Sequence, residues 1–207
     1  MAMISTLFLA GCSVFGVRSG TPEPEHSVVA RIGDDIEIRS YGPRLAAETE
    51  VEAANEQAGR NAAFRALFDY ISGANRAAAK IEMTTPVSID PGPQKIAMTA
   101  PVATAAAGQG RYAMRFFLPA SYTMATAPQP TDPRVRLVEV PAEMLGVLRF
   151  TGSPTETALQ ARQAELLDRL QTSKWRAVGE PVSFLYDSPW TLPFRRRNEV
   201  AVPVVAR

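Results

Sequence analysis

Apolar and polar residues alternate at positions 36–41, which read Ile-Glu-Ile-Arg-Ser-Tyr. A period of two is typical of a strand that buries one face, so the pattern predicts a strand here. Gly42-Pro43 follows and indicates a turn. Residues 45–51 predict a second strand, although their alanines are weak strand formers.

The next pattern has the period of a helix. Phe64, Leu67, Phe68 and Ile71 lie at spacings of three and four, which places them on one helix face. Asn55 is a suitable N-cap for a helix that begins near Glu56. Gly73 stands where a C-terminal glycine is expected.

Two similar octapeptides come next, Lys-Ile-Glu-Met-Thr-Thr-Pro-Val at 80–87 and Lys-Ile-Ala-Met-Thr-Ala-Pro-Val at 95–102. Each predicts a strand that points Ile and Met inward and stops at its proline, Pro86 or Pro101. The turn sequence Asp-Pro-Gly-Pro at 90–93 lies between them, so the pair predicts a hairpin. Residues 112–118 predict a further strand, and a proline-rich loop follows at 128–133.

The second half of the chain repeats this plan. Strands are predicted at 135–140 and 144–150. A helix then follows, with Ser153 as N-cap, Pro154 at N1 and Glu156 at N3, the spacing of a capping box. Its expected buried stripe is Leu159, Arg162, Leu166, Leu167 and Leu170. Final strands are predicted at 175–178, 182–186 and 198–202.

Strand–strand–helix–strand–strand therefore occurs twice. This order predicts a duplicated α+β fold, in which two helices flank one curved antiparallel sheet or a distorted open barrel. With 46% apolar residues, the composition is that of a globular chain. The 22 basic and 21 acidic residues nearly balance, so there is no electrostatic footprint for nucleic acid.

The N-terminal residues indicate a compartment. A short apolar run ends in Leu9-Ala10-Gly11-Cys12, which is similar to a bacterial lipobox, in which the cysteine is lipid-modified. We therefore expect a lipoprotein signal peptide at 1–11, a lipid anchor on Cys12 with a tether over 12–27, and the folded domain at 28–207. Cys12 is the single cysteine, so an intrachain disulfide is excluded. The expected location is the cell envelope, on the periplasmic side of the outer membrane in a host with two membranes.

Several segments together resemble the SOUL/heme-binding protein family over roughly residues 28–203. The two octapeptides are the specific feature, and the weaker segments occur in the family's order. These segments are Ile38–Tyr41, Phe64 with Tyr70–Asn75, Phe117–Pro119 with Tyr122, Phe150–Gly152, and Tyr186 with Pro189 and Arg196–Val200. The resemblance implies quasi-symmetric halves that form a distorted barrel with two helices, similar to the gyrase-inhibitor-like drug-sensing domains.

The resemblance also implies that the domain binds heme or a similar flat, hydrophobic tetrapyrrole in an apolar groove beside the first helix. The candidate binding residues are there: Phe64, Leu67 and Phe68 for the macrocycle, and Arg60 and Arg65 for the propionates. The same apolar stripe could equally be core. Met83, Met98 and Met114 are soft contacts or core residues.

His26 is the single histidine, and it lies in the expected tether. Histidine is a common axial ligand of heme iron. With this residue outside the expected domain, we predict that any heme is held by apolar contact without a histidine ligand, and Tyr or Met stay open as possible ligands.

Two other readings stay open. One hypothesis is a small-molecule hydrolase of the related drug-sensing fold. A pocket carboxylate beside a Tyr or Trp would favour it, and Glu82 and Tyr70 could serve as acid and base. The other is an envelope scaffold without a ligand. The run Arg195-Arg196-Arg197 either binds acidic headgroups or is an ion-paired strand end beside Glu199. No metal-ligand spacing, phosphate loop or Ser/His/Asp set occurs in the sequence.

Overall fold

The computed structural model describes residues 22–76, 94–96, 99–106, 110–187 and 190–207. They divide into two compact units. Unit 1 contains residues 26–40 and 144–207, and unit 2 contains residues 22–25 and 41–143. No helix among the described residues combines the length and apolar character that crossing a membrane requires.

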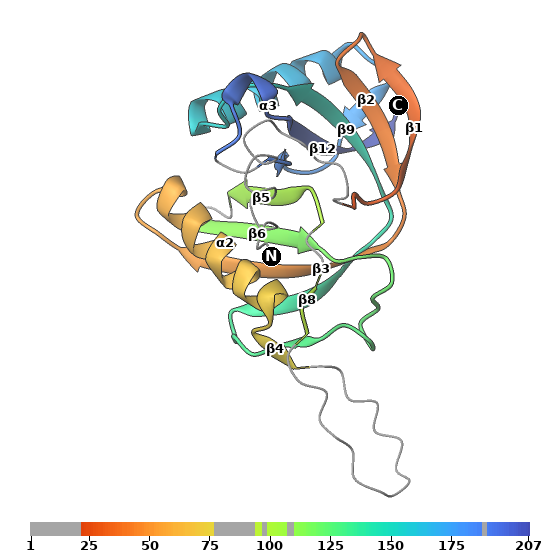
Figure 1. Cartoon of the computed structure of the whole chain (residues 1–207). Helices are drawn as coiled ribbons and strands as arrows, with labels where there is room; N and C mark the ends of the chain where they lie inside the picture. The colour runs from red at the N-terminus through yellow and green to blue at the C-terminus, as the bar shows by residue number, and fades with distance from the viewer. Residues whose placement is uncertain (1–21, 77–93, 97–98, 107–109, 188–189) are drawn as a thin grey trace, which may run out of the picture. The chain divides into compact units, whose positions relative to one another are not determined.

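Unit 2 is an antiparallel sheet with one helix beside it. The sheet order is β5-β6-β3-β8 (Figure 1). The strands are β3 (Arg44–Glu52), β5 (Val102–Ala106), β6 (Arg111–Phe117) and β8 (Val135–Val140). Helix α2 (Glu56–Ser72) packs Ala63, Leu67 and Tyr70 against Ala47 and Phe116 of the sheet. A short pair, β4 (Asn75–Arg76) and β7 (Gln129–Pro130), lies apart from this sheet.

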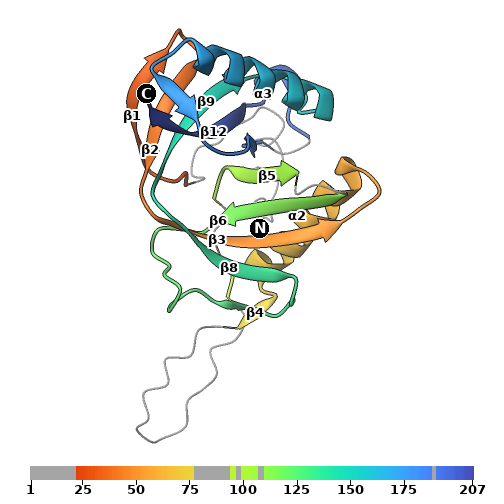
Figure 2. The same cartoon turned by 180° about the vertical axis from the view of Figure 1, so that it is seen from behind.

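Unit 1 repeats the arrangement with helix α3 (Glu156–Gln171). Its strands are β1 (His26–Ile32), β2 (Ile36–Tyr41), β9 (Glu143–Phe150), β10 (Trp175–Ala177), β11 (Val182–Leu185) and β12 (Asn198–Ala206). The sheet runs β1-β2-β9-β12, and both β10 and β11 pair with β12 (Figure 2). Leu166 and Leu170 of α3 pack on Ile38, Leu148 and Val202.

The predicted duplication is present, with an exchange of strands between the repeats. In chain order, β2-β3-α2-β5-β6 corresponds to β8-β9-α3-β11-β12. However, β8 pairs with β3 in unit 2, whereas β2 pairs with β9 in unit 1. Each repeat therefore supplies its first strand to the unit that holds the helix of the other repeat. The α+β class, the duplication and the two helices are confirmed.

The helix ends show one correct prediction and one error. Asn55 caps α2 by accepting a 2.9 Å hydrogen bond from the Ala58 N–H, and Gly73 ends it at φ 127°, a conformation that favours glycine. The predicted N-cap Ser153 is wrong. Thr155 caps α3 by accepting from the Ala158 N–H at 3.2 Å. Thr155 offers a capping hydroxyl as Ser153 does. Because Thr155 is the N-cap, the helix begins two residues later than expected.

The predicted hairpin of the two octapeptides finds only partial support. Its first arm, residues 80–87, lies outside the described residues, as do Met98 and the turn at 90–93. In the second arm, Ile96 is 5% exposed, as expected for an inward residue. However, Pro101 does not end a strand. Residues 99–101 form none, and β5 begins directly after the proline at Val102.

The segment Tyr70–Asn75 at the end of α2, which is part of the family resemblance, has a structural role. Asn75 is buried, and its side-chain amide donates to the carbonyls of Tyr70 (2.7 Å) and Gln94 (2.8 Å). Its carbonyl oxygen accepts from the Gln94 N–H at 3.0 Å. Asn75 thus joins the C-terminal end of α2 to the segment that carries Ile96.

Strand β1 was not predicted. It begins at His26, which was expected in a tether, two residues before the expected start of the domain. Residues 26–29 of β1 are all exposed, so this strand does not show the alternation of buried apolar and exposed polar residues from which the other strands were predicted. The two-residue strands β4 and β7 were also missed, because two residues cannot show a period.

Candidate functional site

The outer face of α2 carries two exposed aromatic side chains. Phe64 is 40% exposed and Phe68 is 44% exposed. Their rings stack, with centroids 5.9 Å apart and an angle of 16° between planes. Phe64 is also held by an edge contact with the core residue Phe116, at 5.5 Å. Helix α2 thus presents two neighbouring aromatic rings to solvent, and the core residue Phe116 contacts one of them.

The predicted stripe therefore divides into two parts. Leu67 and Ile71 belong to the core, and Leu67 has no exposed surface, so it supports the helix and cannot contact a ligand. Phe64 and Phe68 remain accessible. Arg60 lies one turn before Phe64 and is half-buried, and Arg65 is exposed on the neighbouring flank. The exposed part of the predicted site is thus aromatic with cations beside it.

This face suits a porphyrin ring better than it suits an iron atom. Helix α2 contains no His, Met or Cys, and its Tyr70 points into the core. His26 is exposed at the start of β1 in the other unit. Met114 is a buried core residue. No group of three or more His, Cys, Asp or Glu side chains that could hold a metal ion lies among the described residues.

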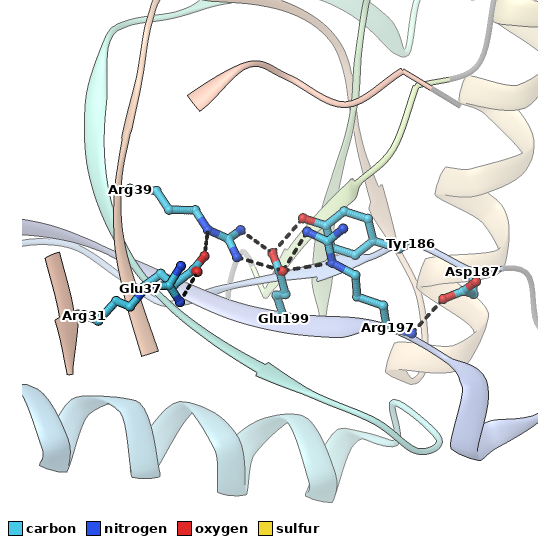
Figure 3. A network of polar contacts seen from close by, with 7 residues as sticks. All are labelled: Arg31, Glu37, Arg39, Tyr186, Asp187, Arg197 and Glu199. Carbon is cyan, nitrogen blue, oxygen red and sulfur yellow. Dashed lines mark hydrogen bonds and ion pairs between the residues drawn. The ribbon is translucent and has the colours of Figure 1, made fainter. Parts of the chain in front are cut away.

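A second polar constellation, which the sequence did not predict as a whole, surrounds Glu199 in unit 1 (Figure 3). Glu199 is fully buried and accepts two hydrogen bonds from Arg39, at 2.8 and 3.1 Å. Arg197 adds two more, at 3.0 and 2.9 Å, and the Tyr186 hydroxyl donates at 2.6 Å. The Arg197 guanidinium lies over the Tyr186 ring, 3.8 Å from its centroid.

The outer end of this network is a second carboxylate. Arg39 Nε donates to Glu37 at 2.8 Å, and Arg31 pairs with the other oxygen of Glu37 at 2.6 Å. The Arg197 N–H donates to Asp187 at 2.7 Å (Figure 3). The expected ion pair between the arginine run and Glu199 is therefore confirmed for Arg197.

Glu199 is held in its charged form. Burial by itself would raise its pKa, but the hydrogen bonds and charge of Arg39, the charge of Arg197 and the Tyr186 hydroxyl outweigh burial. The pKa of Glu199 consequently lies below the ordinary value for a glutamate. A carboxylate in this state cannot deliver a proton at neutral pH, and its oxygens are already occupied.

The environment of Glu199 bears on the hypothesis that the protein is a hydrolase. A carboxylate beside a tyrosine is present in Glu199 and Tyr186, but it is neither accessible nor raised in pKa, as a general acid or base would need to be. Tyr70 is also unsuited, because burial raises the pKa of its hydroxyl, which donates to the Pro128 carbonyl at 2.8 Å. Glu82 lies outside the described residues.

Unit 2 contains a comparable clamp. Glu48 on β3 is buried and pairs with Arg115 of β6 and Arg136 of β8, the residues directly opposite it in the sheet. Burial opposes ionisation of Glu48, but the hydrogen bonds from Arg136 and Arg115 leave its pKa below the ordinary value. Among the described residues, each unit thus has a buried glutamate that lies between two arginines.

Three of the segments that carried the family resemblance meet at these contacts: Ile38–Tyr41, Phe150–Gly152, and Tyr186 with Arg196–Val200. Arg39, Tyr186, Arg197 and Glu199 all come from them, and the Asn198 amide donates to the Gly152 carbonyl at 2.9 Å. The signal that could have indicated this network is the pair of charged residues Arg39 and Glu199, each in a strand pattern that is otherwise apolar or alternating. The pairing itself joins positions 160 residues apart, which one sequence cannot show.

Solved structures confirm the fold class. The C-terminal domain of EcmrR matches with a TM-score of 0.59 at 10% identity, over 83% of this chain and 98% of that one. A hydrolase from Listeria innocua matches with a TM-score of 0.50 at 12% identity, over 83% and 92%. An uncharacterized conserved protein from the same organism matches at 0.51 and 12%, over 90% and 94%. At such identities the likeness establishes the fold alone.

The sequence then identifies the family. It matches the SOUL heme-binding protein family over residues 21–203, which is most of the chain, and the protein belongs to that family. No curated protein matches the sequence.

Proposed function

We propose that this protein binds heme or a similar flat, hydrophobic tetrapyrrole on the outer face of α2, without catalysing a reaction. The supporting observation is the stacked pair Phe64–Phe68, which leaves two aromatic side chains accessible on a helix whose inner face is already filled. Membership of a heme-binding family gives this surface a ligand class.

The flanking charges complete the proposed site. Arg60 and Arg65 stand on either flank of the aromatic pair and supply guanidinium groups for the two propionates. When bound, heme would supply iron chemistry. This chain would contribute a stacking surface and charge, and α2 itself would contribute no histidine, methionine or cysteine ligand.

Binding without catalysis is supported by the state of the buried acids. Glu199 and Glu48 are each paired with two arginines and have lowered pKa values. Neither therefore has the free, proton-exchanging carboxyl that hydrolysis by acid–base catalysis would require.

Titration of the protein with heme and with metal-free porphyrin tests the proposal. Because iron coordination contributes little, the two ligands should bind within about tenfold of each other. Covering the exposed part of Phe68 is worth about 1 kcal/mol, and ring stacking adds about 1 kcal/mol more. Phe68→Ser should therefore weaken both ligands by roughly thirtyfold.

The controls separate binding from folding. Val178→Ser removes an apolar side chain of similar exposure, 48%, from unit 1 and should leave both affinities unchanged. His26→Ala should leave the heme spectrum unchanged. If the folded wild-type protein binds neither ligand saturably, or if His26→Ala alone abolishes heme binding, the proposed site is refuted.

We further propose that the protein is a lipoprotein of the cell envelope, held by lipid on Cys12, on the periplasmic side of the outer membrane in a host with two membranes. The residues Leu9-Ala10-Gly11 before this cysteine support the proposal. Fractionation of cells that express the wild-type chain or Cys12→Ser tests it. The wild-type chain should be found with membranes and the variant should be released, whereas a wild-type chain that stays in the cytoplasm with Met1 intact would contradict it.

A further inference from the structure

The most exposed large apolar side chains of the described residues lie close together on one loop of unit 1. Trp190 is 76% exposed and Phe194 is 68% exposed. They belong to residues 190–195, which we call the 190–195 loop, and they are far more accessible than Phe64 and Phe68. Leaving two such side chains in water is costly, because the transfer of a large aromatic side chain out of water is favourable.

Hydrogen bonds hold the backbone of the 190–195 loop in place. Residues 193–195 form the short 3-10 helix η1 (Pro193–Arg195), in which the Arg195 N–H donates to the Leu192 carbonyl at 2.8 Å. The Arg196 Nε donates to the Thr191 carbonyl at 2.7 Å, and the Gly152 N–H donates to the Pro193 carbonyl at 3.0 Å. Thr191 itself is buried. The aromatic side chains are thus presented outward from a fixed loop.

The charge exposed beside these side chains is positive. The arginine run begins at Arg195, which is exposed, and no carboxylate pairs with it among the residues that the structure describes. Of the two acids between residues 187 and 199, Asp187 is half-buried and accepts from the Arg197 backbone N–H, and Glu199 is fully buried between Arg39 and Arg197. An accessible cation beside accessible aromatic rings matches an anionic, partly apolar surface.

The size of the patch favours a lipid surface over a protein partner. A stable protein interface takes about 20–30 residues a side. The exposed Val205 lies near the far end of β12, about 23 Å along the strand from Asn198, where the chain enters the strand after the loop. A bilayer interface, in contrast, accepts single Trp and Phe side chains at headgroup depth without shape complementarity.

We propose that the 190–195 loop docks on an anionic lipid surface, with Trp190 and Phe194 inserted at the headgroup level and Arg195 beside the acidic headgroups. This surface consists of other residues than the tetrapyrrole site on α2 and does not depend on lipid at Cys12. Each arginine near an anionic surface contributes about 1 kcal/mol.

Vesicle binding of the full chain with Cys12→Ser, which carries no lipid, tests the proposal. Trp175→Phe leaves Trp190 as the single tryptophan, because the chain has two. On vesicles of phosphatidylcholine with phosphatidylglycerol, Trp190 emission should shift to shorter wavelength and become quenched by brominated acyl chains. In the chain that retains both tryptophans, Trp190→Ser with Phe194→Ser should lower partitioning by at least about tenfold. Arg195→Gln should lower it about fivefold on anionic vesicles and leave it unchanged on pure phosphatidylcholine.

The controls make the result specific. Residues 1–11 are common to all these chains, so differences between them report the 190–195 loop. Val178→Ser and Phe68→Ser should bind vesicles as the parent chain does, and circular dichroism should show every variant folded. Equal partitioning of the Trp190→Ser/Phe194→Ser variant would overturn the proposal. The proposal would also be overturned if Trp190 emission did not change on addition of vesicles but changed with protein concentration. That result would assign the loop to contacts between copies of the chain.

Discussion

Replacing Glu199 with glutamine should destabilise the protein strongly, because the amide cannot accept all the hydrogen bonds that the carboxylate accepts. The carboxylate accepts five hydrogen bonds from described residues, two at one oxygen and three at the other. In its better orientation the amide nitrogen would replace the oxygen that accepts from Arg39 Nη1 and Tyr186, so the Arg39 bond would be lost and the Tyr186 hydroxyl would have to accept instead of donate. In the other orientation three would be lost.

The magnitude follows from the burial of the partners. The side chains of Arg39 and Arg197 are 5% and 16% exposed, so they would keep their charges with little water to replace the carboxylate. Removing one partner of a buried ion pair costs about 3–5 kcal/mol. We expect a loss of about 3 kcal/mol, at the lower end, because Arg39 retains Glu37. For a chain of this size the loss corresponds to a melting temperature about 9 °C lower.

Urea unfolding of the wild type and Glu199→Gln measures this loss, and Glu165→Gln is the matched control. Glu165 also pairs with an arginine at 2.6 Å, but on the surface, where such a pair contributes about 0–1 kcal/mol. The effect should also depend on pH in a defined direction. Because the pKa of Glu199 is lowered in the folded state, its contribution is full above the ordinary value of 4.5 and is lost as the pH falls through the folded value.

The stability gap between wild type and Glu199→Gln should therefore be the same at pH 7 and pH 6, and it should narrow below pH 4.5. A Glu199→Gln protein that unfolds within 1 kcal/mol of the wild type, as expected of Glu165→Gln, would refute the reasoning. A gap that widens with acid would refute the assignment of the lowered pKa.

Four further substitutions test the packing and the N-cap of α3. Gly59→Ala should destabilise α2 although alanine is the better helix former by about 1 kcal/mol, because the added methyl would lie 2.3 Å from Cδ2 and 2.6 Å from Cγ of Tyr112; a higher melting temperature would contradict this. Thr155→Ala should cost about 1 kcal/mol in chemical denaturation, whereas Ser153→Ala should cost almost nothing, and the reverse order would restore the N-cap predicted from the sequence. Ile96→Asp should unfold unit 2, because an unpaired charge would replace a side chain that is 5% exposed; an unchanged thermal transition would show that Ile96 is not a core residue.

Local patterns predicted most elements because each is decided by neighbouring residues. The period of two predicted β2 with its observed bounds, the strand predicted at 135–140 matches β8, and Asn55 and Gly73 marked both ends of α2. The strand predicted for the octapeptide at 95–102 is not found in its described residues before Pro101, because contacts with a distant segment decide their conformation. Its alternation is that of a strand, but the Ile96 N–H donates to the Ile71 carbonyl at the end of α2, and the strand forms only after Pro101.

The candidate site was predictable only in part. The helical period placed Phe64, Leu67 and Phe68 on one face, but it could not tell which of them the sheet would cover. Contact with β6 holds Phe64 at the edge of the core and leaves Phe68 outside, while Leu67 is enclosed. The clamp on Glu199 depends on strands from opposite ends of the chain, and no local pattern records such a pairing.

The reciprocal placement of β2 and β8 means that neither half of the chain is self-sufficient. A cut between Phe117 and Val135 would leave β3 with an open edge and would separate β9 from the strand that covers it. The two fragments would have to reassociate to complete either sheet. A single ancestral repeat would have faced the same problem, and two identical copies would have solved it by lending each other their first strands. The present chain therefore has the organisation expected of two such repeats joined covalently.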